Sequence, residues 1–145
     1  MSSTLKIPAD VIADVREGLF CLMGDATQEL DRALTQPDRE LYPEWFADDR
    51  RRIESVFSML DVIGWSAGEE PRDADVELCR YGETLTEALE GYLPLLEAQE
   101  REAEVNDRWR AEQGLRPRKR EIAERLTRVG KFAALVQRRL GEKGD

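Results

Sequence analysis

The sequence predicts an all-α fold: an antiparallel up-down-up-down four-helix bundle with a long, kinked third helix and a protruding hairpin of the third and fourth helices. Apolar residues recur at spacings of three and four in four separate blocks, which is the periodicity of amphipathic helices. Prolines and glycines separate the blocks. A charged share of 37% suits long, solvent-facing helices, and no strand pattern competes.

The first predicted helix covers residues 8–34. Pro8 suits the first helical position, and Asp10 and Asp14 lie near the positive end of the helix dipole. Pro37 is expected to end the helix. Its apolar stripe consists of Val11, Val15, Leu19, Leu22, Ala26, Leu30 and Ala33.

The second predicted helix begins at Pro43 and ends at Gly64. Gly64 is expected to adopt a left-handed conformation, with Trp65 folded back on Leu60. The apolar face of this helix consists of Trp45, Phe46, Ile53, Val56, Phe57, Leu60 and Ile63.

The third predicted helix starts after Asp73, a good N-cap residue, and ends at Gly114. Pro94 is expected to kink it, because proline removes a backbone hydrogen bond and clashes with the preceding turn. The stripe before the kink consists of Leu78, Tyr81, Leu85, Ala88, Leu89, Tyr92 and Leu96. After it, a sparser stripe of Leu95, Ala98, Val105 and Trp109 faces another direction.

The fourth predicted helix starts at Pro117, and its stripe consists of Ile122, Leu126, Val129, Ala133, Val136 and Leu140. A third helix over residues 74–113 would be about 60 Å long at 1.5 Å per residue, against about 33 Å for the second. A hairpin is therefore expected to protrude from a single domain of residues 1–145, in which residues 1–7 and 142–145 are expected to be flexible ends.

Charge is distributed unevenly along the acidic chain, whose net charge is −9. Residues 1–100 carry a net −14 and residues 101–145 a net +5. The overall balance disfavours a nucleic-acid or anionic-membrane platform. Neither a signal peptide nor a membrane-spanning run is recognisable, and two widely separated cysteines fit a reducing compartment, so we expect a cytoplasmic protein.

The chain contains no histidine. This excludes Ser-His-Asp and Cys-His catalytic arrangements and the Glu-x-x-His ligand pairs of di-iron bundles. No glycine-rich phosphate loop is present either. We therefore predict no catalytic residue, no metal site and no cofactor.

Two surfaces are candidates for interaction. The turn before the fourth helix contains four cations, although the helix dipole disfavours positive charge there. They are Arg116, Arg118, Lys119 and Arg120. They fit a solvated turn paired with its own acidic neighbours, a dock for an acidic protein or a second copy, or, less favoured, a nucleic-acid contact. Trp109 belongs to the same protruding hairpin. Phe20 and Cys21 form a second, smaller patch opposite the main stripe of the first helix. Burial by neighbouring helices is the favoured interpretation of this patch, and a packing surface for another subunit is the alternative.

An aromatic group could line a pocket between helices, with Trp45, Tyr81 and Tyr92 as its candidate residues. The same residues also suit an ordinary core. The favoured function is that of a non-enzymatic protein acting through protein–protein contacts, as a homodimer or with an acidic partner. The alternatives are a small-molecule-binding protein or enzyme using the aromatic pocket, and a nucleic-acid-associated regulator using residues 116–120.

Overall fold

The computed structural model describes residues 3–35, 43–66 and 71–143. Most of them are helical, as predicted, in α1 (Ala9–Thr35), α2 (Pro43–Ile63), α3 (Leu78–Glu112) and α4 (Lys119–Lys143). Two short strands are added to these helices, β1 (Thr4–Ile7) before α1 and β2 (Ala74–Glu77) before α3. Pro37, the expected stop of the first helix, and residues 144–145 lie outside the described residues.

The strands correct one expectation. No strand was expected, but Thr4–Ile7 pairs antiparallel with Ala74–Glu77 in the register Thr4 to Glu77. Leu5, Ile7 and Val76 are buried by this pairing while their neighbours face outward. Burial of these alternate side chains anchors β1 on the helical core.

Asp73 is not the N-cap of the third helix; its side chain instead caps the start of α1 from a distant part of the chain. Its Oδ1 accepts a hydrogen bond of 2.8 Å from the backbone N–H of Ala9, the first residue of α1. The expected third helix started directly after Asp73, whereas α3 begins at Leu78 because residues 74–77 pair with β1. The N–H of Leu78 instead donates to the carbonyl of Ser3, at 2.9 Å.

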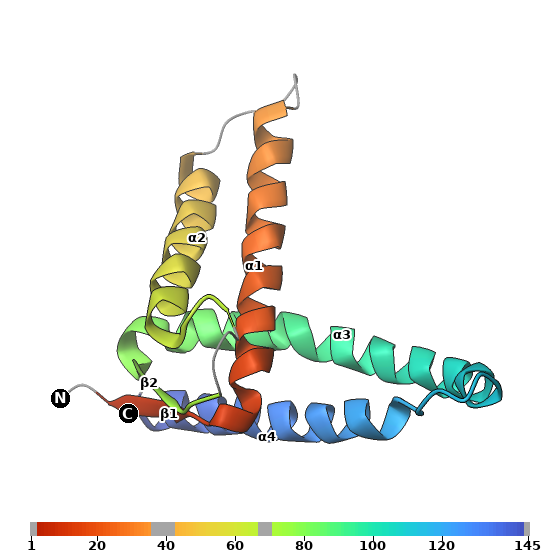
Figure 1. Cartoon of the computed structure of the whole chain (residues 1–145). Helices are drawn as coiled ribbons and strands as arrows, with labels where there is room; N and C mark the ends of the chain where they lie inside the picture. The colour runs from red at the N-terminus through yellow and green to blue at the C-terminus, as the bar shows by residue number, and fades with distance from the viewer. Residues whose placement is uncertain (1–2, 36–42, 67–70, 144–145) are drawn as a thin grey trace.

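The helices form two antiparallel hairpins that cross, rather than four helices side by side (Figure 1). In this view α1 and α2 stand upright, α3 and α4 run across, and the lower part of α1 passes over α3 and reaches the level of α4. An up-down-up-down bundle would need α3 to run back along α2; instead, β2 carries the chain along β1 before α3 begins. The crossing is close, since a Cβ on Gly18 would lie 3.1 Å from the carbonyl oxygen of Ala88.

The core lies where the two hairpins cross. The predicted stripe of α3 is buried throughout, from Leu78 to Leu96. In α2, Val56 and Leu60 are buried as predicted, Met59 joins them, and Phe57 is exposed. Phe132 of α4 is buried although it lay outside the predicted stripe.

Helix ends follow the glycine signals. Gly64 has φ of +97° and its N–H donates to the carbonyl of Leu60 at 2.8 Å, as expected of a helix-terminating glycine. Trp65 packs on Phe57, with ring centroids 5.2 Å apart. Pro94 lies inside α3, which is assigned as one helix, and the kink predicted there stays a prediction.

Candidate interaction surface

The far half of the α3–α4 hairpin stands clear of the other helices (Figure 1). The α3 helix ends at Glu112, and Gly114 adopts a φ of +73° that reverses the chain. The N–H of Leu115 then donates to the carbonyl of Arg110, at 2.8 Å. The 35 residues of α3 correspond to about 52 Å at 1.5 Å per residue, so this helix extends well beyond the crossing.

Asp107 caps the first turn of α4 from the neighbouring helix. Its two carboxylate oxygens accept the backbone N–H groups of Arg118, at 2.9 Å, and Lys119, at 3.0 Å. These hydrogen bonds, with the nearby charges of Arg110 and Lys119, hold the pKa of Asp107 below its ordinary value. A carboxylate at this helix end also offsets the unfavourable position of the cations.

Two of the four cations in the basic turn are engaged within the hairpin. The Nζ of Lys119 lies 2.9 Å from Oε1 of Glu104, and this hydrogen bond raises the pKa of Lys119. Arg120 pairs with Glu124 at 3.5 Å. Within residues 3–35, 43–66 and 71–143, the exposed guanidinium groups of Arg116 and Arg118 form no ion pair.

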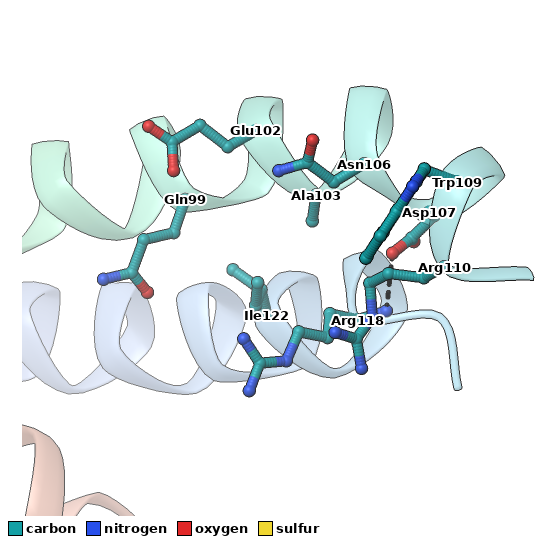
Figure 2. A pocket seen from close by; sticks show the side chains of 9 residues that line it. All are labelled: Gln99, Glu102, Ala103, Asn106, Asp107, Trp109, Arg110, Arg118 and Ile122. Carbon is teal, nitrogen blue, oxygen red and sulfur yellow. Dashed lines mark hydrogen bonds between the residues drawn. The ribbon is translucent and has the colours of Figure 1, made fainter. Parts of the chain in front are cut away.

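Large apolar side chains are exposed on the same half of the hairpin. Val105 is 76% exposed and Trp109 58%, and Leu95 and Leu115 are each 45% exposed. Trp109 also lines a groove of about 350 Å³ that runs between α3 and α4 (Figure 2). Ala103 and Ile122 point toward one another across it, and Trp109 stands at the end nearest the turn. We call this half of the hairpin, residues 95–122, the hairpin surface.

A hollow of about 520 Å³ lies where the α1–α2 hairpin meets α3. Its lining includes Asp25 and Glu29 of α1, Arg52 of α2, and Glu87, Glu90 and Gly91 of α3. Arg52 pairs with Glu87 at 3.2 Å and with the buried Asp49 at 3.3 Å. A hydrogen bond to Asp49 and the charge of that residue raise the pKa of Glu29. We call this hollow the acidic corner; the sequence reasoning did not anticipate it.

The Phe20 and Cys21 patch is separate from the hairpin surface. Phe20 contacts Trp65, with ring centroids 6.2 Å apart, and Trp65 donates from Nε1 to Asp61 at 2.7 Å. Burial, with the charges of Glu17 and Asp25, raises the pKa of the Cys21 thiol. A raised pKa disfavours the thiolate, which is the nucleophilic form.

The tyrosines of the predicted aromatic pocket are core residues with different partners. Tyr81 is buried and its hydroxyl lies 2.7 Å from Oγ of Ser58, in α2. The Tyr92 hydroxyl donates to Asp14, in α1, at 2.8 Å. The third candidate, Trp45, belongs to α2, but its side chain lies outside the described residues. Both described hydroxyls are therefore occupied by protein groups.

A buried charged group joins three helices at the crossing. The Asp14 side chain is 5% exposed, and its Oδ1 accepts hydrogen bonds from Tyr92 of α3 and, at 2.7 Å, from Arg125 of α4. Burial and the hydrogen bond to Asp14 raise the pKa of Tyr92. Burial by itself would lower the pKa of Arg125, but Asp14 raises it overall.

The role of Asp14 at the crossing was not predicted from the sequence, which indicated only its place near the positive end of the helix dipole. Its position between the stripe residues Val11 and Val15 was a usable signal, because a carboxylate on a buried helix face needs a partner.

The described part of the chain contains no group of three or more cysteine, aspartate or glutamate residues placed to hold a metal ion. Nor is any helix in those residues long and apolar enough to cross a membrane. No protein-family model, no curated protein and no solved structure matches the chain.

Proposed function

We propose that the protein works through protein–protein contacts rather than catalysis, and that it associates with a second copy of itself through the hairpin surface. The observation that carries this proposal is the exposure of Val105, Trp109 and Leu115 on a part of the hairpin that stands clear of the other helices. Clustered apolar side chains of this size are typical of binding surfaces, because their burial is favourable.

Two arginines extend this surface. Arg116 and Arg118 are exposed beside Leu115, and their guanidinium groups form no ion pair in the described residues. Tryptophan and arginine are the residue types that contribute most often to the centre of an interface. The combination supports a contact that is partly apolar and partly electrostatic.

A second copy is the partner that best matches the charge of the chain. Residues 1–100 carry a net −14 and residues 101–145 a net +5, so each copy offers an acidic region to the basic turn of the other. Closed twofold dimers are also the commonest assemblies of identical chains. The free thiols of Cys21 and Cys79 support a reducing compartment such as the cytoplasm.

Sedimentation velocity over a wide range of protein concentration tests this proposal. The wild type should sediment as a dimer at high concentration. A variant with Val105→Ser and Trp109→Ala should dimerise at least about tenfold more weakly, because both changes remove exposed contact residues. Val62→Ser is the matched control, since Val62 is 50% exposed on α2.

Two results would overturn the proposal. One is a wild type that has the mass of a single chain at every concentration. The other is a dimer that Val62→Ser weakens as much as the hairpin variant does. Circular dichroism of each variant separates loss of association from loss of folding.

A further inference from the structure

One face of α3, which we call the seam, carries the exposed large apolar residues of this helix. Its positions alternate in steps of four and three: Gly91, Leu95, Ala98, Glu102, Val105 and Trp109. These alternating steps place every second position seven residues apart, which is the spacing of a coiled-coil contact line. Leu96 and Ala103, which face the core, lie on another side of the helix. Within the described residues, Leu95, Val105 and Trp109 are left exposed along the seam.

The seam runs into the acidic corner at Gly91. A Cβ placed on Gly91 would meet no atom within 4 Å, so the space above this residue is open. The hollow at this point, about 520 Å³, is large enough for an aromatic side chain. One end of the seam therefore offers an exposed tryptophan and the other end offers an acid-lined space.

We propose that two copies pair antiparallel along this seam, with Trp109 of each copy entering the acidic corner of the other beside Gly91. This inference rests on the proposed function and specifies which residues of the two copies contact one another. It follows from the complementarity of the two seam ends in size and in charge.

The seam positions match when α3 is paired with its copy about a twofold axis near residue 100. Leu95 then faces Val105 of the second copy, Ala98 faces Glu102, and Gly91 faces Trp109. In each pair the larger side chain faces a smaller one or, at Gly91, a glycine without a side chain, as interdigitated packing requires. The paired stretch, residues 91–109, corresponds to about 27 Å of helix.

The shape of the molecule suits this pairing. The two hairpins form arms that meet near the acidic corner (Figure 1). A twofold copy can lay its long α3–α4 arm along that of the first molecule, so that each hairpin end reaches the α1–α2 arm of the other. Both copies use the same surface in this contact, so the assembly stops at a dimer and does not extend into a filament.

Charge favours the same arrangement. Arg108 lies next to Trp109 and is exposed, and in the antiparallel pairing it approaches Glu87 and Glu90 of the second copy. Neither Arg108 nor Glu90 forms an ion pair in the described residues. Both can therefore pair between copies without breaking an existing bond.

Cysteine cross-linking tests the register. In a background with Cys21→Ser and Cys79→Ser, the double variant Leu95→Cys/Val105→Cys should form a covalent dimer on mild oxidation with oxidised glutathione. Each single cysteine variant should cross-link much more weakly. In the antiparallel pairing, the same position in the two copies is separated by ten residues along the helix, about 15 Å, which is too far for a disulfide.

The outcomes separate this inference from the proposed function. A wild type that never dimerises would overturn both. The protein could instead dimerise in sedimentation but cross-link through Val105→Cys alone, or through no pair of seam positions. That result would overturn the antiparallel pairing and leave the proposed function standing.

A steric block provides a second test. Gly91→Met should abolish most of the dimer, at least about tenfold in dissociation constant, because its side chain occupies the space assigned to Trp109. Gly141→Met is the matched control, since a Cβ there also meets no atom within 4 Å. Both variants should retain the helical circular dichroism and thermal stability of the wild type. An unchanged dimer in Gly91→Met would contradict the proposal.

Discussion

Asp14 is the residue on which the crossing of the two hairpins depends most directly. Its buried carboxylate binds Tyr92 and Arg125, which belong to the other hairpin. We expect Asp14→Ala to lower the free energy of unfolding by about 2–3 kcal/mol, because it leaves the partly buried guanidinium unpaired. Urea denaturation measures the change. Glu17→Ala, an exposed change on α1, should stay within about 0.5 kcal/mol, and an equal loss in both variants would contradict the assigned role.

The Tyr92 hydroxyl should make the stability of the folded state depend on pH in the alkaline range. Its pKa is raised on folding, so the folded state holds this proton more tightly than the unfolded chain does. The stabilising contribution is complete below the ordinary tyrosine pKa of about 10 and is lost as pH rises above it. The urea midpoint should therefore fall more steeply above about pH 10 in the wild type than in Tyr92→Phe. Parallel curves for the two proteins would contradict this prediction.

Of the six elements in the part of the chain that the structure describes, the four helices were predictable and the two strands were not. The helices follow from long apolar stripes, and their ends follow from Pro43, Gly64 and Gly114. The strands have only four residues each and pair across about 70 positions, so neither segment contains a local signal strong enough to outweigh the helix pattern beside it. Asp73 has the expected chemistry, but only the folded chain shows which helix it caps.

The start of α4 depends on a residue of α3. Asp107→Ala should accelerate hydrogen exchange at the amides of Arg118 and Lys119, because both N–H groups lose their acceptor. Asp107→Asn keeps one acceptor oxygen and replaces the other with a donor, so it should preserve the protection of only one of the two amides. NMR hydrogen exchange resolves the individual amides. Equal protection in wild type and Asp107→Ala would show that the carboxylate does not cap this helix.

At the level of the whole molecule, the sequence indicated part of the candidate site. The mismatch in helix lengths predicted a protruding hairpin with Trp109 and the basic turn, and the structure places them together. The acidic corner was not predictable, because Asp25 and Glu90 belong to different helices whose crossing is fixed by the sheet and by Asp14. Helical periodicity describes single helices and does not specify how two hairpins cross.

Assembly should respond to salt if the basic hairpin end meets the acidic corner. Raising ionic strength screens exposed charges, so the dimer dissociation constant should increase several-fold between about 0.05 M and 0.5 M sodium chloride. Sedimentation at both concentrations measures it. Because Arg108→Glu removes the pairing charge, that variant should dimerise more weakly at low salt and depend less on salt. A wild-type dimer that tightens with salt would point to a purely apolar contact.

The sheet also has a consequence for the order in which the fold is completed during synthesis. Ser3 and Thr4 accept hydrogen bonds from Arg139, at 2.8 and 3.2 Å, and Thr4 lies opposite Glu77 in the strand pairing. Residues near position 4 are translated long before position 139, so they must wait for partners that emerge late. The α1–α2 hairpin can form early, and β1 can pair once β2 has been translated, but the contacts made by Arg125 and Arg139 must follow translation of α4. The nascent chain therefore exposes the apolar residues Leu5 and Ile7 at least until residues 74–77 have been translated, which is an interval in which a chaperone could engage it.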